Sequence, residues 1–262
     1  MSPRFRTWEE YLCPGTDVLR NKAGLHDATS LREFEEEAAF LRMSEILVQS
    51  PVPGELDRAH MCAIHEHVFG DIYEWAGQER TAPAFPKRMS KNGPSPQKIA
   101  TGQYDAPADH PYEYFPAGPV MTEHFDLWAR RLHRMNDYAA MSPGEFSAAI
   151  AEPWGEMNVA HLFREGNTRT QVAFFTYFAR EHGHVFDYTR FTEVNFRLKF
   201  NAGRFMVQAA KGEELLVSAI TEVVTPNPDR QQAFAPPADD KGPDDYQPHY
   251  ESSDPGPSKP AG

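Results

Sequence analysis

The sequence predicts an all-α fold followed by a disordered C-terminal tail, and three observations support this. Between Trp8 and Val224, apolar residues recur three or four positions apart in most segments, as in helices with one buried face. The stretch from Arg80 to Phe115 breaks this pattern with Pro, Gly, Ser and Asn, so we expect a long connection with one small β-hairpin. Residues 225–262 carry few large apolar side chains and much Pro, Asp, Gly and Ser, which predicts disorder. We expect one domain over residues 1–224 and a tail over residues 225–262.

The predicted helices follow one another along the domain. In residues 57–73, Met61, Ile64 and Val68 lie three or four positions apart, and Asp57 is a suitable N-terminal cap. Residues 145–160 repeat the pattern, although Pro153 must start or kink that helix because it has no backbone N–H. The predicted helices, in chain order, are 31–49, 57–73, 121–135, 145–160, 169–181, 191–205 and 213–224.

Composition excludes several classes of protein. The formal net charge of −12 over 262 residues argues against bulk attraction to nucleic acid or anionic membranes, so phosphate binding must come from a local site. No apolar run is long enough to span a bilayer, and Met1 to Tyr11 lacks the apolar core of a secretory signal. Two distant cysteines, Cys13 and Cys62, form neither a disulfide framework nor a zinc ligand set. We expect a cytoplasmic protein with no membrane partner and no direct nucleic-acid partner.

The stretch 161–170, His-Leu-Phe-Arg-Glu-Gly-Asn-Thr-Arg-Thr, lies between two predicted helices and has the features of a phosphate site. Thr168 with the Gln three positions later fits a capping box, which predicts a helix start. The unpaired N–H groups and positive dipole end of a helix start favour an anion. Gly166 allows close approach of the backbone to a ligand, and Arg169 adds a forked donor for phosphate oxygens. Asn167 can donate or accept a hydrogen bond.

Two more residues of this stretch suit group transfer. His161 can accept a proton near neutral pH, and Glu165 offers the hard oxygen that Mg²⁺ takes beside phosphates. A base, a metal carboxylate and a phosphate cradle together suit phosphoryl or nucleotidyl transfer, in which catalysis consists mainly of positioning and charge stabilisation. Each residue alone has a simpler interpretation: a capping or buried histidine, a solvated carboxylate, a Gly-Asn turn.

The string as a whole resembles the motif of the Fic family, His-x-Phe-x-(Asp/Glu)-Gly-Asn-(Gly/Lys)-Arg. The matching residues are His161, Phe163, Glu165, Gly166, Asn167 and Arg169. Two further segments resemble the family in the same order: Tyr11 to Lys22, and Asp71 to Thr81 with the sequence Asp-Ile-Tyr-Glu-Trp-Ala-Gly-Gln-Glu-Arg-Thr. The resemblance, which covers residues 8–224, implies a Fic-type helical bundle with a small β-hairpin flap.

The resemblance implies a protein adenylyltransferase. Such an enzyme transfers AMP from ATP, with Mg²⁺, to a Tyr, Thr or Ser hydroxyl of a target protein, either in its own cytoplasm or in a cell into which it is delivered. His161 would deprotonate the target hydroxyl, and Glu165 would hold Mg²⁺ on the ATP phosphates. The nucleotide would be bound by Gly166, Asn167, Thr168 and Arg169, through backbone and amide donors and the guanidinium.

The resemblance also implies that a flap pairs with the backbone of the target. Its first strand is expected just after Arg80, and the target-binding residues would be Thr81, Ala82, Pro83, Ala84, Phe85 and Lys87. Residues 88–111 look like an insertion, after which the family pattern resumes near residues 112–119.

Two positions depart from the family pattern. Thr168 stands where Gly or Lys is usual, and Val172 replaces a second Arg that in the family contacts the terminal phosphate and pairs with an inhibitory Glu. The pose of the γ-phosphate and this mode of inhibition are therefore open. The inhibitory sequence Ser/Thr-x-x-x-Glu-(Gly/Asn) is matched only in its first spacing, at Thr29–Glu33 and Ser218–Glu222. A separate small antitoxin, as in a toxin–antitoxin pair, is therefore a candidate partner.

Other functions of the same loop remain open at this point. A Fic-type enzyme can act as a kinase, use another nucleotide or remove AMP, but kinase-like members tend to carry Ala-Asn-Lys-Arg where this chain has Gly-Asn-Thr-Arg. A catalytically degenerate Fic module is the alternative outside catalysis. The intact His161 argues against it, whereas Val172 argues mildly for it.

Overall fold

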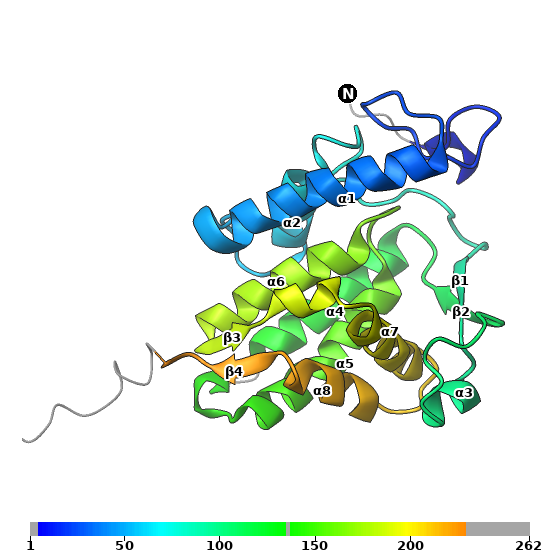
Figure 1. Ribbon diagram of the computed structural model, residues 1–262. Helices are drawn as coiled ribbons and strands as arrows, with labels where there is room; N and C mark the ends of the chain where they lie inside the picture. The colour runs from blue at the N-terminus through cyan, green and yellow to red at the C-terminus, as the bar shows by residue number, and fades with distance from the viewer. Residues whose placement is uncertain (1–4, 135–136, 229–262) are drawn as a thin grey trace, which may run out of the picture. The chain divides into compact units, whose positions relative to one another are not determined.

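The computed structural model describes residues 5–134 and 137–228 (Figure 1). Its helices are α1 (Ala28–Ser44), α2 (Arg58–Phe69), α3 (Pro96–Ala100), α4 (Pro119–Arg134), α5 (Pro143–Ala160), α6 (Asn167–Glu181), α7 (Val194–Gln208) and α8 (Glu214–Thr221). Its strands are β1 (Met89–Gly93), β2 (His110–Tyr114), β3 (His184–Phe186) and β4 (Val224–Pro226). Helices dominate and the strands form two small sheets, so the predicted fold class is confirmed.

The helix starts follow from capping chemistry. Asp27 and Asp57 accept hydrogen bonds from the first turns of α1 and α2. Ser142 and Glu145 form a reciprocal capping box, so α5 begins there. The helix continues through Pro153, so this proline does not start it, which was one of the two possibilities that the sequence offered.

Helices α5 and α6 form the centre of the domain. All residues from Thr170 to Ala179 of α6 are buried, and Trp154 of α5 stacks on Phe175 of α6 with ring centroids 4.1 Å apart. Helix α2 packs against α6, whereas α4, α7 and α8 pack against α5 (Figure 1). The loop 161–166 joins these two central helices, so both of its ends are held by the core.

A hairpin of β1 and β2 corresponds to the predicted flap, but its first strand lies later in the chain than expected. The antiparallel register pairs Met89 with Tyr114 and Gly93 with His110. Residues 81–87, expected as a strand, contain a bridge at Ala84 and no regular strand. Pro83 and Pro86 explain this, because proline cannot donate to a β ladder.

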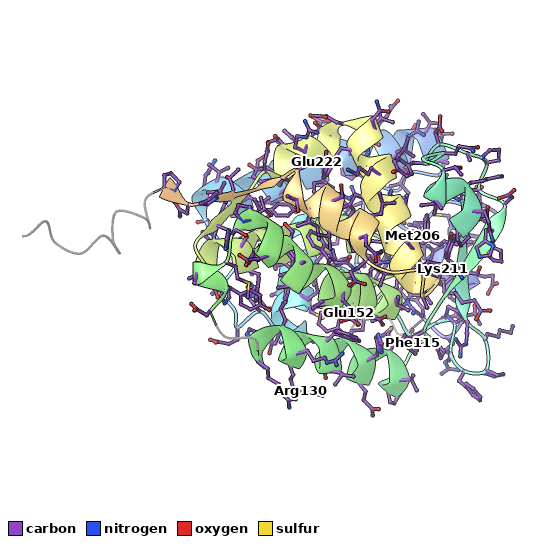
Figure 2. All side chains as sticks on the ribbon, turned by 90° about the horizontal axis from the view of Figure 1, so that it is seen from below. Phe115, Arg130, Glu152, Met206, Lys211 and Glu222 are labelled. Carbon is purple, nitrogen blue, oxygen red and sulfur yellow. The ribbon has the colours of Figure 1, made fainter. Side chains whose placement is uncertain are left out.

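The supposed insertion, residues 88–111, therefore contains β1 together with α3. Helix α3 contacts α7, and Tyr112 of β2 stacks on Phe205 of α7 with ring centroids 4.2 Å apart. At its other end the hairpin meets α5 through Phe115, which Figure 2 labels. The N–H of Phe115 donates to the carbonyl of Val159 at 3.3 Å. The hairpin is thus fixed to α7 and to α5, the helix that leads into the loop.

A second sheet was not expected from the sequence. Strands β3 and β4 pair antiparallel, with Val185 opposite Thr225. Thr225 and Pro226, assigned to the tail, therefore belong to a strand, while the tail beyond residue 228 lies outside the described residues. No helix within residues 5–134 and 137–228 combines the length and apolar composition needed to cross a bilayer.

Candidate active site

Two residues in the left-handed region define the ends of the loop 161–166. His161 ends α5 with φ 50° and ψ 63°, and Gly166 precedes α6 with φ 80°. A Cβ at Gly166 would lie 2.4 Å from the ring of Phe69, so glycine is required both by conformation and by space. The predicted capping box at Thr168 does not form, because Gly166 is the N-cap and no side chain caps the helix.

Asn167 closes the loop on itself. Its Oδ1 accepts from the N–H of Phe163 at 3.0 Å, and its Nδ2 donates to the carbonyl of Phe163 at 2.7 Å. The amide was expected to donate to an anion, but here both of its polar atoms hold the loop. Asn167 can therefore bind an anion only through its backbone N–H, which lies in the first turn of α6.

His65 braces the loop from α2, and the sequence analysis missed it. Gly77 N–H donates to its Nδ1 at 2.8 Å, so the proton is on Nε2, which donates to the carbonyl of Glu165 at 3.0 Å. The ring stacks on Phe163 at 3.9 Å, and complete burial lowers the pKa of His65 to about 3. The one signal in the sequence was its position beside Met61, Ile64 and Val68 on the buried side of a helix.

Arg80 also supports the loop, a role that the sequence did not indicate, since it placed this residue just before a target-facing strand. It is 2% exposed, and its guanidinium donates to the carbonyls of His161 at 2.7 Å, Ala160 at 3.2 Å and Phe115. Its own N–H donates to the carbonyl of Leu162 at 2.8 Å. Burial lowers the pKa of Arg80 to about 10, so it stays charged at neutral pH and donates to buried carbonyls at the end of α5 that have no partner within the helix.

His161 lies at the centre of the site in a form suited to a base. Its side chain is buried beneath Tyr114 of β2, with ring centroids 4.5 Å apart. Neither ring nitrogen meets the geometry of a hydrogen bond within the described residues. Burial, then the charges of Lys91, Arg80 and Arg204, lower the pKa of His161 well below its usual value, while the nearby backbone of Asn158 opposes this shift weakly. The imidazole is therefore neutral and able to accept a proton at pH 7.

This environment predicts how His161 titrates. A histidine whose pKa is depressed stays neutral when the pH falls through ~6.5, the ordinary value. We expect the His161 signal in nitrogen-detected NMR of the free protein, assigned by its loss in His161→Asn, to remain that of a neutral ring from pH 7.5 to about 5.5. A midpoint near the ordinary value would show that water reaches the ring and would contradict the buried, neutral base.

The first turn of α6 offers backbone N–H groups to an anion, and two charges adjoin it. Glu165 Oε1 accepts from the N–H of Gly166 at 2.9 Å. Arg169 lies over the ring of Phe69, with its guanidinium carbon 4.8 Å from the centroid, and forms an ion pair with Glu35 of α1. Glu35 also accepts from the hydroxyl of Tyr73. The charge of Arg169, predicted to bind phosphate, is thus largely balanced by the protein itself.

Glu165 is the loop residue that could hold a metal ion. The described residues contain no cluster of three or more His, Cys, Asp or Glu side chains that could enclose one. Mg²⁺ needs no such cluster, since it commonly uses one or two carboxylates together with substrate phosphates and water. A single carboxylate beside an anion-binding helix start fits Mg²⁺ that arrives with a nucleotide.

The residues predicted to bind the target have mixed environments. Ala82 is fully buried, and Pro83 uses its carbonyl to accept from Ala117 N–H at 2.8 Å. Thr81 donates its hydroxyl to the carbonyl of Phe5. In contrast, Phe85 is 83% exposed, and Ala84 and Lys87 are exposed as well. Only part of this segment is free to meet another molecule, and none of it reaches the loop as a strand.

Comparison with known proteins agrees with this geometry. The Fic/DOC family model matches residues 55–179, which include α2, the hairpin and the loop. A probable protein adenylyltransferase of Sinorhizobium fredii, y4lH, is 36% identical over 187 residues, which are 70% of this chain and 82% of the relative. The chain belongs to the Fic/DOC family. The protein adenylyltransferase VbhT of Bartonella schoenbuchensis is 31% identical over 182 residues, which cover 70% of this chain but 33% of VbhT.

Solved Fic structures share the fold. The Bartonella tribocorum effector BepC, crystallised with bound AMPPNP, superposes with a TM-score of 0.67 at 21% identity and covers 83% of this chain and 97% of its own. A Fic domain from Bartonella quintana with bound ADP gives a TM-score of 0.69 at 21% identity and covers 86% and 98%. The predicted Fic-type helical bundle is therefore confirmed.

Proposed function

We propose that the protein transfers AMP from ATP to a Tyr, Thr or Ser hydroxyl of another protein. The observation that carries this proposal is the buried, neutral imidazole of His161, which no side chain of the described residues hydrogen-bonds, next to the anion-binding start of α6. The curated relatives are named protein adenylyltransferases, and they place the chain among the nucleotidyltransferases. ATP as substrate is supported by the Fic structures with bound AMPPNP and ADP.

In the proposed reaction a ring nitrogen of His161 accepts the proton of the target hydroxyl. The oxygen attacks the α-phosphorus of ATP, a new P–O bond forms, and the bond to the β-phosphate oxygen breaks with release of pyrophosphate. Backbone N–H groups of Asn167 and Thr168 stabilise the charge that develops on the phosphates. Glu165 would hold Mg²⁺, which when bound neutralises phosphate charge.

The β1–β2 hairpin is the best place for the target to bind. A two-stranded sheet leaves the outer edge of each strand unpaired within the sheet, so an extended segment of the target can add to it. The middle of β1, Ser90, Lys91 and Asn92, is exposed. We therefore assign the pairing with the target to residues 89–93, whereas the sequence analysis had assigned it to residues 81–87. Because Tyr114 of β2 covers His161, the hydroxyl reaches the ring only when this contact loosens.

The two segments with partial inhibitory spacing do not reach the loop. Glu222, at the end of α8, pairs with Lys199 and Arg190 on the surface (Figure 2), and Glu33 is exposed on α1. Neither of these two segments supplies an inhibitory glutamate to the loop within the described residues, and a small antitoxin stays part of the proposal.

Labelled ATP tests the proposal against its alternatives. The protein is incubated with cell lysate and ATP labelled at either the α- or the γ-phosphate, and label on protein is measured. We expect label from the α position alone, because AMP transfer keeps this phosphorus and releases the other two. Label from the γ position would indicate a kinase. No label from either would indicate AMP removal or a degenerate module.

A further inference from the structure

Helix α7 brings a second arginine, Arg204, to the start of α6, and no sequence motif contains this residue. Arg204 is 7% exposed, and its guanidinium donates to Thr168 Oγ1 at 3.0 Å and to Gln171 Oε1 at 3.3 Å, both in the first turns of α6. It also donates to Asn158 Oδ1 at 3.0 Å and to Asn201. Its charge contributes to the lowered pKa of His161, so the group lies close to the proposed base as well.

The charge of Arg204 is not balanced by the protein. All four acceptors are neutral oxygens, no carboxylate within the described residues pairs with it, and its Nε has no hydrogen-bond partner there. Burial lowers the pKa of Arg204 to about 10, so it remains charged at neutral pH. A buried charge without a counter-ion is costly, and such groups normally meet an opposite charge.

Arg169 differs in this respect. It forms an ion pair with Glu35, and its side chain is directed toward α1 and Phe69. Arg204 therefore offers a greater net attraction to an anion than Arg169 does. This reverses the sequence-based expectation, which gave that role to Arg169 alone.

The position of the Arg204 guanidinium also explains why valine can stand at position 172, where the family has a second arginine. Side chains on a helix lean toward its N-terminus, so a long side chain at position 172 would cover position 168, one turn earlier. Arg204 contacts Thr168 and Gln171, so its guanidinium reaches this same area from α7. The cation missing from α6 is thus supplied by another helix.

We propose that Arg204 binds the polyphosphate of ATP and replaces the missing second arginine of the loop motif. This rests on the proposed function, because it assigns the anion to the same nucleotide site. Ordering of Arg204 by Thr168, Gln171 and Asn158 before the nucleotide arrives reduces the entropy lost on binding. Thr168, which stands where the family usually has Gly or Lys, then has a structural role, because its hydroxyl accepts a hydrogen bond from Arg204.

The test compares nucleotides that differ only in phosphate number. Calorimetry measures the affinities of ATP and AMP, with Mg²⁺ present, for the wild-type protein, Arg204→Met, Arg204→Lys and the control Arg197→Met, an exposed arginine on the same helix. We expect Arg204→Met to weaken ATP binding roughly 10- to 100-fold, the effect of one charge-assisted hydrogen bond. AMP binding should weaken much less, Arg204→Lys should be intermediate, and Arg197→Met should match the wild type.

A purely structural role gives a different result. If Arg204 only braces α6 and α7, Arg204→Met weakens ATP and AMP equally, and the proposal fails. It also fails if Arg204→Met binds ATP like the wild type. If that variant does not fold, the wild-type Nε–H NMR signal of Arg204 decides: a shift with ATP but not with AMP supports the contact, and no shift overturns it. Arg204-dependent ATP binding without AMP transfer to any protein would contradict the proposed function and leave this inference standing.

Discussion

The His161→Asn variant should bind ATP with nearly the affinity of the wild-type protein while AMP transfer falls roughly 10²- to 10⁴-fold, the usual cost of losing a general base. The nucleotide is held by the first turn of α6 and its neighbouring cations, and none of these groups is anchored by the imidazole, whose ring nitrogens have no partner within the described chain. Asparagine is chosen because residue 161 has φ 50°, and Asn adopts this left-handed conformation more readily than Ala. His161→Ala would add backbone strain to the loss of the ring.

Three measurements on His161→Asn separate catalysis from structure: melting temperature, ATP affinity and rate of label transfer. His26 is an exposed histidine near the N-terminus, far from residue 161 in the sequence. The matched control His26→Ala should leave all three quantities unchanged. If the ring only braces the end of α5, the variant loses stability and ATP affinity together. Unchanged transfer by a folded variant would remove His161 from the mechanism.

Replacing Arg80 with methionine should lower the free energy of unfolding by roughly 3–5 kcal/mol, since each hydrogen bond from a charged group contributes about 1.5–3 kcal/mol. The guanidinium holds the carbonyls of Ala160, His161 and Phe115, and methionine would leave these buried acceptors without donors. AMP transfer by the folded fraction should fall too, because the backbone of His161 loses its main support. Urea unfolding and label transfer under native conditions measure the two effects.

The control for this variant is Arg88→Met. Arg88 lies eight positions further along the chain on the surface, its side chain is 55% exposed, and it pairs with Glu113 at 3.6 Å. Exposed ion pairs contribute about 0–1 kcal/mol, so Arg88→Met should unfold almost like the wild type. Equal stability losses in the two variants would show that Arg80 is not the brace that its contacts indicate.

The helices and the loop could be predicted because their signals are local. Periodic apolar residues identified all the helices of eight residues or more that the structure describes, and the loop and the helix start that follows it lie within one short string. The fold class followed from the same periodicity. The order of the three family-like segments added the identity of the loop.

What the sequence did not reveal depends on residues far apart in the chain. His65, Arg80 and Arg204 act on the loop from α2, the segment after it and α7, and no spacing rule connects them. The hydrogen-bond partners of each are main-chain groups or neutral side chains. Their roles depend on tertiary packing, which periodicity does not encode.

The flap strand was misplaced and the second sheet was missed for local reasons. The segment after Arg80 has the position expected of a flap strand, but Pro83 and Pro86 deprive it of donors, and β1 forms only at Met89. Strands β3 and β4 span three residues each, too short for an alternating pattern to be recognised.

The identity of the transferred group tests the central claim most directly. Wild-type protein and His161→Asn are each incubated with cell lysate, ATP and Mg²⁺, and modified peptides are identified by tandem mass spectrometry. We expect the wild-type reaction alone to contain peptides that carry one AMP, linked through phosphate to a Tyr, Thr or Ser oxygen. A wild-type reaction that yields phosphate in place of AMP on these side chains, or no adduct beyond those formed with His161→Asn, would contradict the proposed function.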